Sequence, residues 1–293
     1  MAMVGAGGKT TAMFGLARQL TPPVLVSATT HLAQHQLRFA DRYFPIDEGA
    51  DIRRLGEQGF SGVTLLIGKP CEDQRALGLS AEQIGAVYAQ AEEHNLPLLV
   101  EADGSRQLPM KAPAAHEPAI PPWANTVMVV AGMSGLGKPL DSQHVHRPEI
   151  FAQLTGLRPS DPVTPEAVQC LLCHPLGGLK NIPDAARRVV LLNQVDDAAL
   201  YQQAMPLAQS LLSCYSAVIL AKSEGENSPA RQELLELSVM RVVEQVAGIV
   251  LAAGGSLRFG RPKALLDWHG QPFIRQVVQK ALGAGLLPVV VVV

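Results

Sequence analysis

A glycine-rich segment with a lysine and two threonines lies near the start of the sequence, and these residue types suit phosphate binding. The segment comprises Gly5, Ala6, Gly7, Gly8, Lys9, Thr10 and Thr11. Glycines let several backbone N–H groups converge on phosphate oxygens at the positive end of a helix. We expect Lys9 to contact the phosphates and the Thr10 hydroxyl to ligate Mg²⁺. Met3 stands where the strict motif has glycine, and a tight turn between strand and helix is the alternative interpretation.

Acidic residues follow a predicted buried strand farther along the chain. Residues 98–104 read Leu-Leu-Val-Glu-Ala-Asp-Gly, which places Glu101 and Asp103 at the carboxyl end of that strand. A carboxylate in this position supports Mg²⁺ in phosphate-loop NTPases. We expect Asp103 to support the metal and Glu101 to position an attacking water. The alternative is an Asp-Gly turn without a catalytic role.

An Asn-x-x-Asp box follows another predicted strand and pairs Asn193 with Asp196. This spacing matches the guanine-reading box of GTPases, although Gln194 replaces the usual lysine. We expect Asp196 to accept hydrogen bonds from a guanine edge and Asn193 to tie neighbouring loops together. An ordinary polar loop is the alternative, as for any short motif.

Charged and histidine side chains elsewhere give weaker signals. Arg106 and Lys111 lie around a proline-rich segment, residues 107–123, which we expect to be a functional loop. They are suited to clamp an anion, and solvated loop charges are the equal alternative. Four histidines lack recognisable metal-ligand spacing, so local hydrogen bonding is favoured over a metal or selenium site. They are His31, His116, His146 and His174.

The four cysteines do not predict a disulfide framework, because they are few and scattered. Cys170, Cys173 and His174 have the spacing of a haem attachment site, but export and an axial partner would be needed. The stretch is better interpreted as the end of a helix that begins after Thr164, with both cysteines on its apolar side. We therefore expect a reducing, cytoplasmic environment.

A second glycine loop follows a predicted strand near residue 250 and has a different character. Gly254, Gly255 and Ser256 would present backbone amides to a triphosphate, while Arg258 and Lys263 neutralise its charge. A helix is expected after residues 270–272. An unrelated glycine-rich turn is the alternative.

Short apolar runs that alternate with helix-length segments must position these loops. Strands are expected at residues 24–27, 63–67, 96–100, 126–130, 189–192, 217–220 and 249–253. Nearly continuous apolar character is typical of parallel strands covered on both faces. Helices are expected at residues 10–19, 80–94 and 228–246, the last from an apolar stripe. The fold class is therefore α/β, a three-layer parallel sheet, with a domain boundary around residues 245–247.

The amino-acid composition argues against several classes of protein and of binding partner. Of the 293 residues, 47% are hydrophobic and 17% charged, which excludes a disordered chain. The net charge of −2 and the 4% of aromatic residues argue against nucleic acid as a partner. The apolar runs are too short to span a membrane, and no export signal precedes the first glycine loop.

Several ordered motifs over residues 1–245 resemble the YqeC-type accessory proteins of selenium-dependent molybdenum hydroxylases. They lie at residues 4–11, 28–31, 100–106, 108–113, 116–118, 145–149, 174–180 and 193–196. The resemblance implies a P-loop NTPase-like domain that binds ATP or GTP with Mg²⁺ and assists maturation of such a hydroxylase. Two departures are Gln194, where the family usually has lysine, and the short stretch before Gly5.

Residues 246–293 closely resemble the beginning of the MobA-like nucleotidyltransferases, including the molybdenum cofactor cytidylyltransferases. The resemblance implies a truncated Rossmann-like start that would use CTP and molybdopterin cofactor. The downstream metal-binding carboxylates are missing from this piece, so we expect it not to complete the transfer alone. The chain is thus interpreted as an interrupted fusion, with a valine-rich end prone to aggregation.

Three functions are compatible with these sequence motifs. The first is a P-loop nucleotide-binding protein, an expected NTPase, that assists cofactor or hydroxylase maturation. The second is a molybdenum cofactor cytidylyltransferase whose catalytic part is missing. The third is a carrier that binds nucleotide without hydrolysis and hands a cofactor to a partner.

Overall fold

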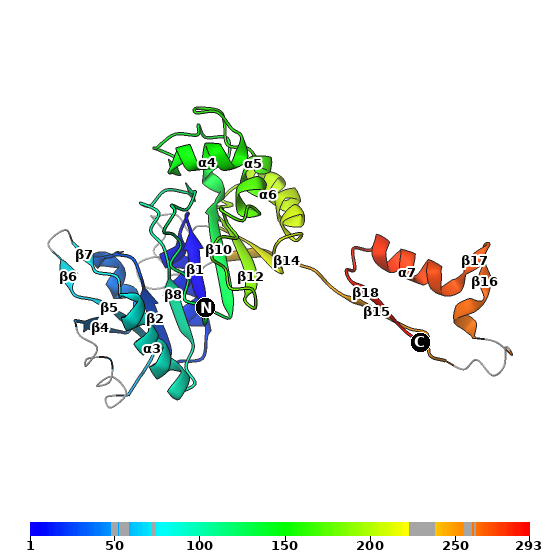
Figure 1. The fold of residues 1–293 in the computed structure, drawn as a ribbon, viewed down its shortest axis with the longest axis horizontal. Helices are drawn as coiled ribbons and strands as arrows, with labels where there is room; N and C mark the ends of the chain where they lie inside the picture. Colours follow the sequence, from blue (N-terminus) through cyan, green and yellow to red (C-terminus); the bar gives the residue numbers. More distant parts are fainter. Residues whose placement is uncertain (48–51, 53–58, 72–73, 223–237, 255–259, 261) are drawn as a thin grey trace. The chain divides into compact units, whose positions relative to one another are not determined.

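The computed structural model describes residues 1–47, 52, 59–71, 74–222, 238–254, 260 and 262–293 (Figure 1). Contacts divide the chain into two compact units, Met1–Val243 and Glu244–Val293. None of the described helices has the length and apolar character that crossing a membrane requires.

A nine-stranded sheet forms the centre of the larger unit, in the order β14-β13-β12-β10-β1-β8-β2-β5-β4. Each of the seven strand pairings described between β4 and β13 is parallel. The strands are β1 (Ala2–Gly5), β2 (Val24–Ala28), β4 (Arg42–Ile46), β5 (Val63–Gly68), β8 (Leu98–Glu101), β10 (Thr126–Gly132), β12 (Arg187–Asn193), β13 (Ala217–Lys222) and β14 (Ser238–Glu244). The expected α/β class with a large, mostly parallel sheet is confirmed.

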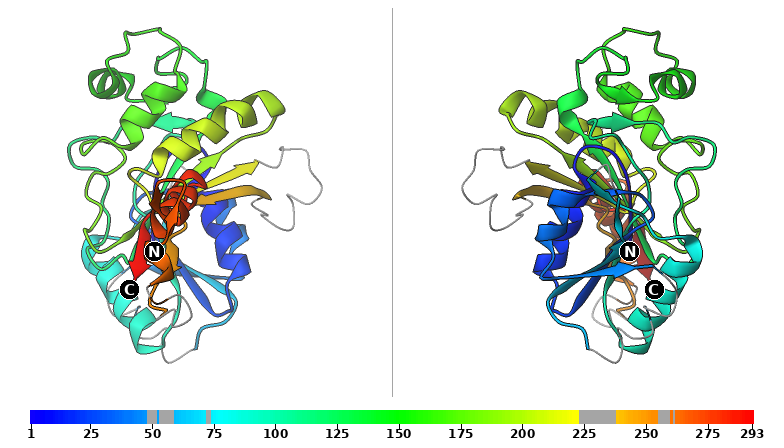
Figure 2. Two further views of the ribbon diagram at one scale, coloured as in Figure 1. Left: turned by 90° about the vertical axis from the view of Figure 1, so that its right-hand side faces the viewer. Right: turned by 90° about the vertical axis from the view of Figure 1, so that its left-hand side faces the viewer.

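Helices cover both faces of this sheet, as the continuous apolar strands predict. The helices are α1 (Lys9–Gln19), α3 (Ala81–Glu93), α4 (Pro148–Thr155), α5 (Pro165–Leu172) and α6 (Ala198–Leu211). Figure 2 shows α1 and α3 on opposite sides of the sheet. Met3 packs with Met13 and Phe14 of α1, whereas Val4, its neighbour in β1, packs in the cluster formed with α4, α5 and α6.

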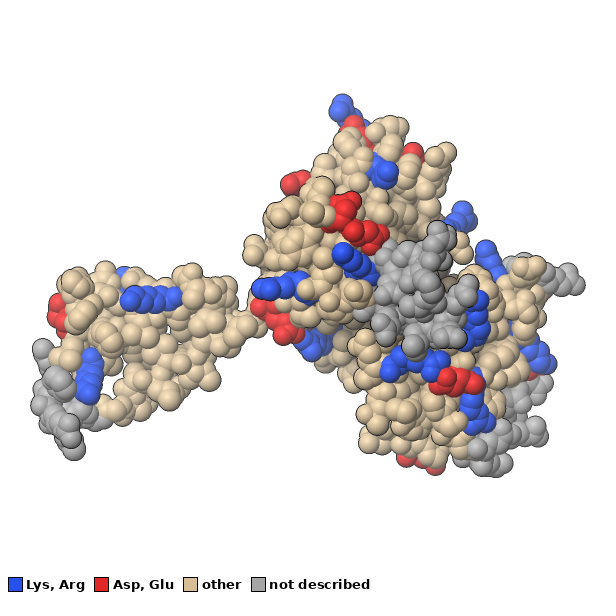
Figure 3. All heavy atoms as spheres, turned by 180° about the vertical axis from the view of Figure 1, so that it is seen from behind, with Lys and Arg blue, Asp and Glu red and all other residues tan. Residues whose placement is uncertain are grey.

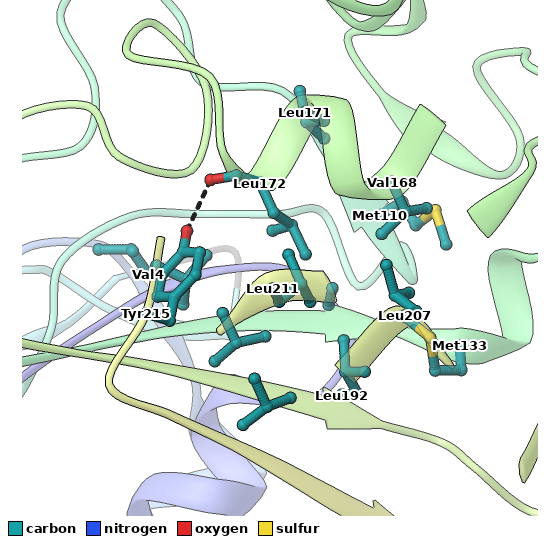
Figure 4. Close-up of a cluster of buried hydrophobic side chains, with 14 of the residues drawn as sticks. Val4, Met110, Met133, Val168, Leu171, Leu172, Leu192, Leu207, Leu211 and Tyr215 are labelled. Carbon is teal, nitrogen blue, oxygen red and sulfur yellow. Dashed lines mark hydrogen bonds between the residues drawn. The ribbon is translucent and has the colours of Figure 1, made fainter. Parts of the chain in front are cut away.

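The cluster on the Val4 side is the larger core, and Figure 4 shows part of it. Leu171 and Leu172 of α5 meet Leu207 and Leu211 of α6 there. Tyr215 is 3% exposed, and its hydroxyl donates a 2.7 Å hydrogen bond to the carbonyl oxygen of Leu172. This bond satisfies a phenol that would otherwise lose its water on burial.

Local signals account for several helix starts. The Ser80 hydroxyl accepts a hydrogen bond from the backbone N–H of Gln83, and the Gln83 side-chain oxygen accepts one from the backbone N–H of Ser80, so α3 begins with a capping box. Thr164 caps α5 in the same position, and Pro148 occupies the first turn of α4, where its fixed φ angle suits a helix start. Asp197 caps α6, a helix that the sequence interpretation did not include.

Short elements complete the larger unit. They are β3 (Leu32–Ala33), β6 (Pro70–Cys71), β7 (Arg75–Ala76), β9 (Met110–Lys111), β11 (Val145–His146), and the 3-10 turns η1 (Gln34–Phe39) and η2 (Met133–Gly135). The proline-rich segment is a loop apart from β9, which pairs with β11. This pairing brings residues 145–147 beside the acidic strand end.

The prediction of a helix at residues 228–246 is wrong for the part of this range that the structure describes. Residues 238–244 form β14, at the edge of the sheet, and residues 228–237 lie outside the described residues. The apolar residues that suggested a helical stripe include Val239 and Val242, which lie in β14, and β-branched side chains favour a strand.

The smaller unit is built around one parallel strand pair and a helix. It contains β15 (Gly248–Leu251), η5 (Lys263–Leu265), β16 (Asp267–Trp268), β17 (Gln271–Pro272), α7 (Phe273–Gly283) and β18 (Val289–Val292). β15 pairs with β18 in register from Gly248 to Leu251. Apolar side chains on this pair are exposed, including Ile249 at 70% and Leu251 at 80%. The face of this unit seen in Figure 3 is formed mostly by uncharged residues.

Candidate functional site

Three left-handed glycines shape the loop between β1 and α1. Gly5, Gly7 and Gly8 have φ values of 98°, 89° and 109°. A Cβ atom on Gly5 would lie 2.2 Å from the carbonyl oxygen of Val130, and one on Gly7 would lie 2.4 Å from the backbone nitrogen of Gly132. Both the backbone angles and the close approach to β10 therefore require glycine.

Neighbouring strands hold this loop through hydrogen bonds. The Ala6 N–H donates to the carbonyl oxygen of Val130 at 2.9 Å, and the Gly7 N–H donates to that of Leu108 at 3.1 Å. Asn193, 2% exposed at the end of β12, donates through Nδ2 to the carbonyl oxygen of Gly7 at 2.7 Å. Its buried Oδ1 has no hydrogen-bond partner among the described residues. The structure thus brings Asn193 to the loop, as expected of a residue that ties loops together.

Lys9 begins α1 and is buried at the base of the loop. Its Nζ donates to the carbonyl oxygen of Gly5 at 2.7 Å, and lies 3.3 Å from Asp103 Oδ1 and 3.6 Å from Glu101 Oε1. Burial acts to lower the pKa of Lys9, but the two carboxylates outweigh it and the pKa is raised. Lys9 therefore carries its positive charge at neutral pH.

The two acidic residues at the end of β8 have different neighbours. Glu101 accepts a 2.8 Å hydrogen bond from the Thr10 hydroxyl, and burial raises its pKa. Asp103 accepts the Gly5 N–H with both carboxylate oxygens at 3.0 Å. The carboxylate that contacts Thr10 is consequently Glu101, while Asp103 contacts the loop backbone and Lys9. Thr10 thus has Glu101, and not Asp103, as its carboxylate partner.

A buried ion network extends from Asp103 to the start of α4. Lys111 Nζ lies 2.7 Å from Asp103 Oδ2 and 2.8 Å from Glu117 Oε2. Arg147 forms a two-pronged pair with Glu117, at 2.7 and 2.9 Å. Burial acts to raise the pKa of Glu117, but hydrogen bonds from Lys111 and Arg147 outweigh it and lower the pKa to about 2. Glu117 and Arg147 belong to this network, whose connectivity no spacing in the sequence revealed.

Residues 174–181 fasten the loop that carries Glu117. The Lys180 ammonium donates to the carbonyl oxygens of Ala114 and Ala115, and Asn181 donates to that of Pro118 at 2.9 Å. A Cβ on Gly178 would lie 2.4 Å from the carbonyl oxygen of Leu172, which explains a glycine there. By holding this loop, these residues keep Glu117 in position within the ion network.

An open cleft of about 1200 Å³ lies over the loop between β1 and α1. Gly8, Lys9, Thr10 and Thr11 line one part, together with Glu101 and Gln194. Cationic side chains line much of the rest, namely Arg38, Arg75, Arg106 and Arg147. The electrostatic character of these walls suits an anionic ligand. Asp196, which follows β12, is exposed and lies outside the set of lining residues.

The second predicted site falls mainly on residues that the structure does not describe. Gly255, Ser256 and Arg258 lie outside the described residues. Gly254 is exposed just after β15, and Lys263 begins η5. These two residues keep their phosphate-binding role as a prediction.

The cysteines differ from the expectation. Cys173 and Cys214 form a disulfide across 41 residues, because the end of α5 and the segment after α6 pack together. Cys170 is exposed rather than on the apolar side of α5. Within the described ranges, no group of three or more histidine, cysteine or acidic residues is placed to hold a metal ion.

Comparisons with known proteins match the two parts of the chain separately. A model of the YqeC protein family matches residues 1–149, and a MobA-like NTP transferase domain model matches residues 248–293. The uncharacterized protein YqeC of Escherichia coli (strain K12) is 34% identical over 199 residues, 66% of this chain and 75% of that protein. The comparison with solved structures finds no significant match.

The C-terminal part is similar to proteins that carry a different description. A probable molybdenum cofactor guanylyltransferase of Bacillus cytotoxicus is 60% identical over 37 residues, 13% of this chain. One from Bacillus cereus (strain B4264) is 48% identical over 50 residues, 17% of this chain. The chain spans about a fifth to a quarter of the length of these transferases. The family match over residues 1–149 and the 34% identity to the Escherichia coli protein show that this chain belongs to the YqeC family.

Proposed function

We propose that the larger unit binds a nucleoside triphosphate with Mg²⁺ and uses it in maturation of a molybdenum enzyme or its cofactor. The observation that carries the proposal is the phosphate loop itself. Three left-handed glycines present the backbone, Lys9 is charged beneath them, and Thr10 meets a carboxylate. The adjoining transferase-like segment supports the link to molybdenum cofactor chemistry.

The residues present fit a magnesium ion. Thr10 Oγ1 and the Glu101 carboxylate lie 2.8 Å apart, and Mg²⁺ prefers such oxygen ligands together with phosphates and water. Thr10 would hold the ion directly and Glu101 through water, and the bound ion would neutralise phosphate charge. The Lys9 ammonium would exchange its contact with Gly5 for a phosphate oxygen, while Asp103 keeps the loop in place.

Binding by calorimetry tests this proposal on the full chain. The protein is titrated with non-hydrolysable analogues of ATP, GTP and CTP in the presence of Mg²⁺. We expect Lys9→Ala to weaken the affinity for nucleotide at least tenfold. Lys138→Ala is the matched control, because Lys138 is exposed and does not line the cleft. Equal affinity of Lys9→Ala and the unaltered chain would refute the assignment.

The choice of nucleotide follows from the same titrations. Asn193 and Asp196 stay the proposed base contacts, and preference for the GTP analogue would support them. Turnover assays with ATP and GTP then separate an NTPase from a carrier that binds nucleotide without hydrolysing it. Addition of a molybdenum hydroxylase tests whether that partner stimulates turnover.

Nucleotidyl transfer is the second candidate, favoured by the match of residues 248–293 to the transferase domain. In this function Gly254, Gly255, Ser256, Arg258 and Lys263 would bind CTP or GTP. Incubation with molybdopterin cofactor and labelled CTP or GTP tests it, with pyrophosphate release as the readout. Release that survives Lys263→Ala would argue against the assigned residues.

A further inference from the structure

The cleft reaches beyond the space that the nucleotide of the proposed function would take. With phosphates at Lys9 and a base near Asn193, the nucleotide lies toward β10 and β12. The sheet order places β8 and β2 on the other side of β1. The loops after β8 and β2 line that other side, and a volume of about 1200 Å³ exceeds the range usual for one small-molecule pocket.

Cationic residues gather on the β8 side of the cleft. Arg106 follows β8 in a left-handed conformation with φ 51°, and its exposed side chain makes no ion pair with any described residue. Arg147 stands beside it with one carboxylate partner, Glu117. Lys111 already pairs with both Asp103 and Glu117, whereas Arg106 faces the cleft without an ion-pair partner among the described residues, so its charge is available to an anion.

His146 lies among these cations. Burial, followed by the charges of Arg147, Lys111 and Arg106, lowers its pKa to about 4, and the opposite effect of Glu117 is smaller. His146 is therefore neutral at pH 7 in a region that also holds Arg106, Arg147 and Lys111.

A side pocket of 330 Å³ opens at the same three residues. Arg106, His146 and Arg147 line both this pocket and the main cleft. The pocket is completed by the start of α4, where Pro148 and Glu149 lie, and by Leu108, Ser142 and Val145. An anion bound at the three residues would therefore have room for the remainder of its molecule.

We propose that Arg106, His146 and Arg147 form a second anion site, which binds a phosphate-like dianionic group of a small-molecule ligand beside the nucleotide. The ligand is the class of molecule that a nucleotide-dependent protein would act on, so this assignment rests on the proposed function. Arg106 and Arg147 supply charge-assisted hydrogen bonds, and the side pocket accommodates the rest of the ligand.

Sulfate is the probe, since it stays a dianion over the pH range of interest. We expect the full-length Lys9→Ala variant to keep one sulfate site, and the added change Arg106→Gln to weaken it about tenfold in calorimetric or NMR titration. Arg158→Gln is the matched control, because that side chain is 86% exposed and lines neither cavity. Loss of all sulfate binding in Lys9→Ala alone, or no effect of Arg106→Gln, would overturn the proposal.

Nucleotide titrations separate this site from the first. Arg106→Gln should leave the affinity for the preferred triphosphate analogue within about threefold of the unaltered chain. A loss as large as that caused by Lys9→Ala would assign Arg106 to the nucleotide instead and refute a second site. Sulfate binding that depends on Arg106 in a chain that binds no nucleotide would overturn the proposed function and leave the anion site standing.

Proton uptake by His146 on sulfate binding is a further test, because a purely structural role of these residues would not produce it. A bound dianion opposes the effect of Arg106, Arg147 and Lys111 and adds to that of Glu117, so the pKa of His146 should rise from about 4. Sulfate affinity should therefore increase as the pH falls from 7 toward 5. A pKa of His146 that is unchanged at saturating sulfate, measured by NMR, would contradict the site.

Discussion

Glu117 gives the sharpest test of the ion network, because two cations share one largely buried carboxylate. Lys111 and Arg147 hold it at 2.8 and 2.7 Å, and together they lower its pKa from 4.5 to about 2. That difference corresponds to at most about 3 kcal/mol of folding free energy. Solvent reaches part of the carboxylate and screens the pairs, so we expect about half of this, roughly 1.5 kcal/mol.

The substitution Glu117→Gln removes the charge with little change in shape. At pH 7 it should lower the free energy of unfolding by roughly 1.5 kcal/mol, a fall in melting temperature of roughly 3 to 6 °C for a unit of this size. Because the folded pKa lies below the unfolded one, this contribution is complete above about pH 4.5 and is lost as the pH falls toward 2. The difference between the two proteins should shrink over that window.

Urea unfolding followed by circular dichroism measures this difference from pH 7 down to pH 3. Glu93→Gln is the control, since Glu93 lies on the exposed surface of α3 and should change stability by less than about 0.5 kcal/mol. Equal unfolding midpoints for Glu117→Gln and the unaltered chain at pH 7 would refute the reasoning. A difference that stays constant down to pH 3 would show that the effect is not one of ionisation.

Three further changes probe the architecture. Gly7→Ala should destabilise the larger unit by about 3 kcal/mol or more in urea unfolding, because its Cβ would overlap β10, whereas Gly137→Ala, with open space around it, should cost about 1 kcal/mol. Tyr215→Phe should cost about 1 to 2 kcal/mol in the same assay, since a buried carbonyl loses its donor. Reduction of the Cys173–Cys214 disulfide should lower stability by up to about 4 kcal/mol for a loop of 41 residues, and unchanged midpoints in reducing buffer would contradict this.

Local patterns in the sequence predicted the elements that carry the loops. The strand predicted at residues 189–192 and the helix predicted at residues 80–94 depend on local patterns, and the structure has β12 and α3 there. The prediction of a helix at residues 228–246 was wrong for β14. The valines there have the spacing of one helix face, but β-branched side chains also pack well at a sheet edge.

The partners of the side chains in the site could not be predicted from motif spacing, because they depend on tertiary contacts between residues far apart in the sequence. Glu101 and Asp103 are both plausible metal carboxylates in sequence, and only the approach of Thr10, 91 residues away from Glu101, distinguishes them. Glu117 meets Arg147 because β9 pairs with β11. The Cys173–Cys214 pair likewise depends on how α5 packs against α6.

The short strand β1 has a consequence for the order of events during synthesis. It lies between β8 and β10, and its pairing partners extend to Val130 in register with Gly5. The loop at its end therefore cannot take its final form until Val130 has left the ribosome. Once β8 has been made, β1 has one of its two neighbouring strands, and we expect its other edge to stay unpaired until β10 follows, which makes that edge a target for chaperones that hold nascent chains.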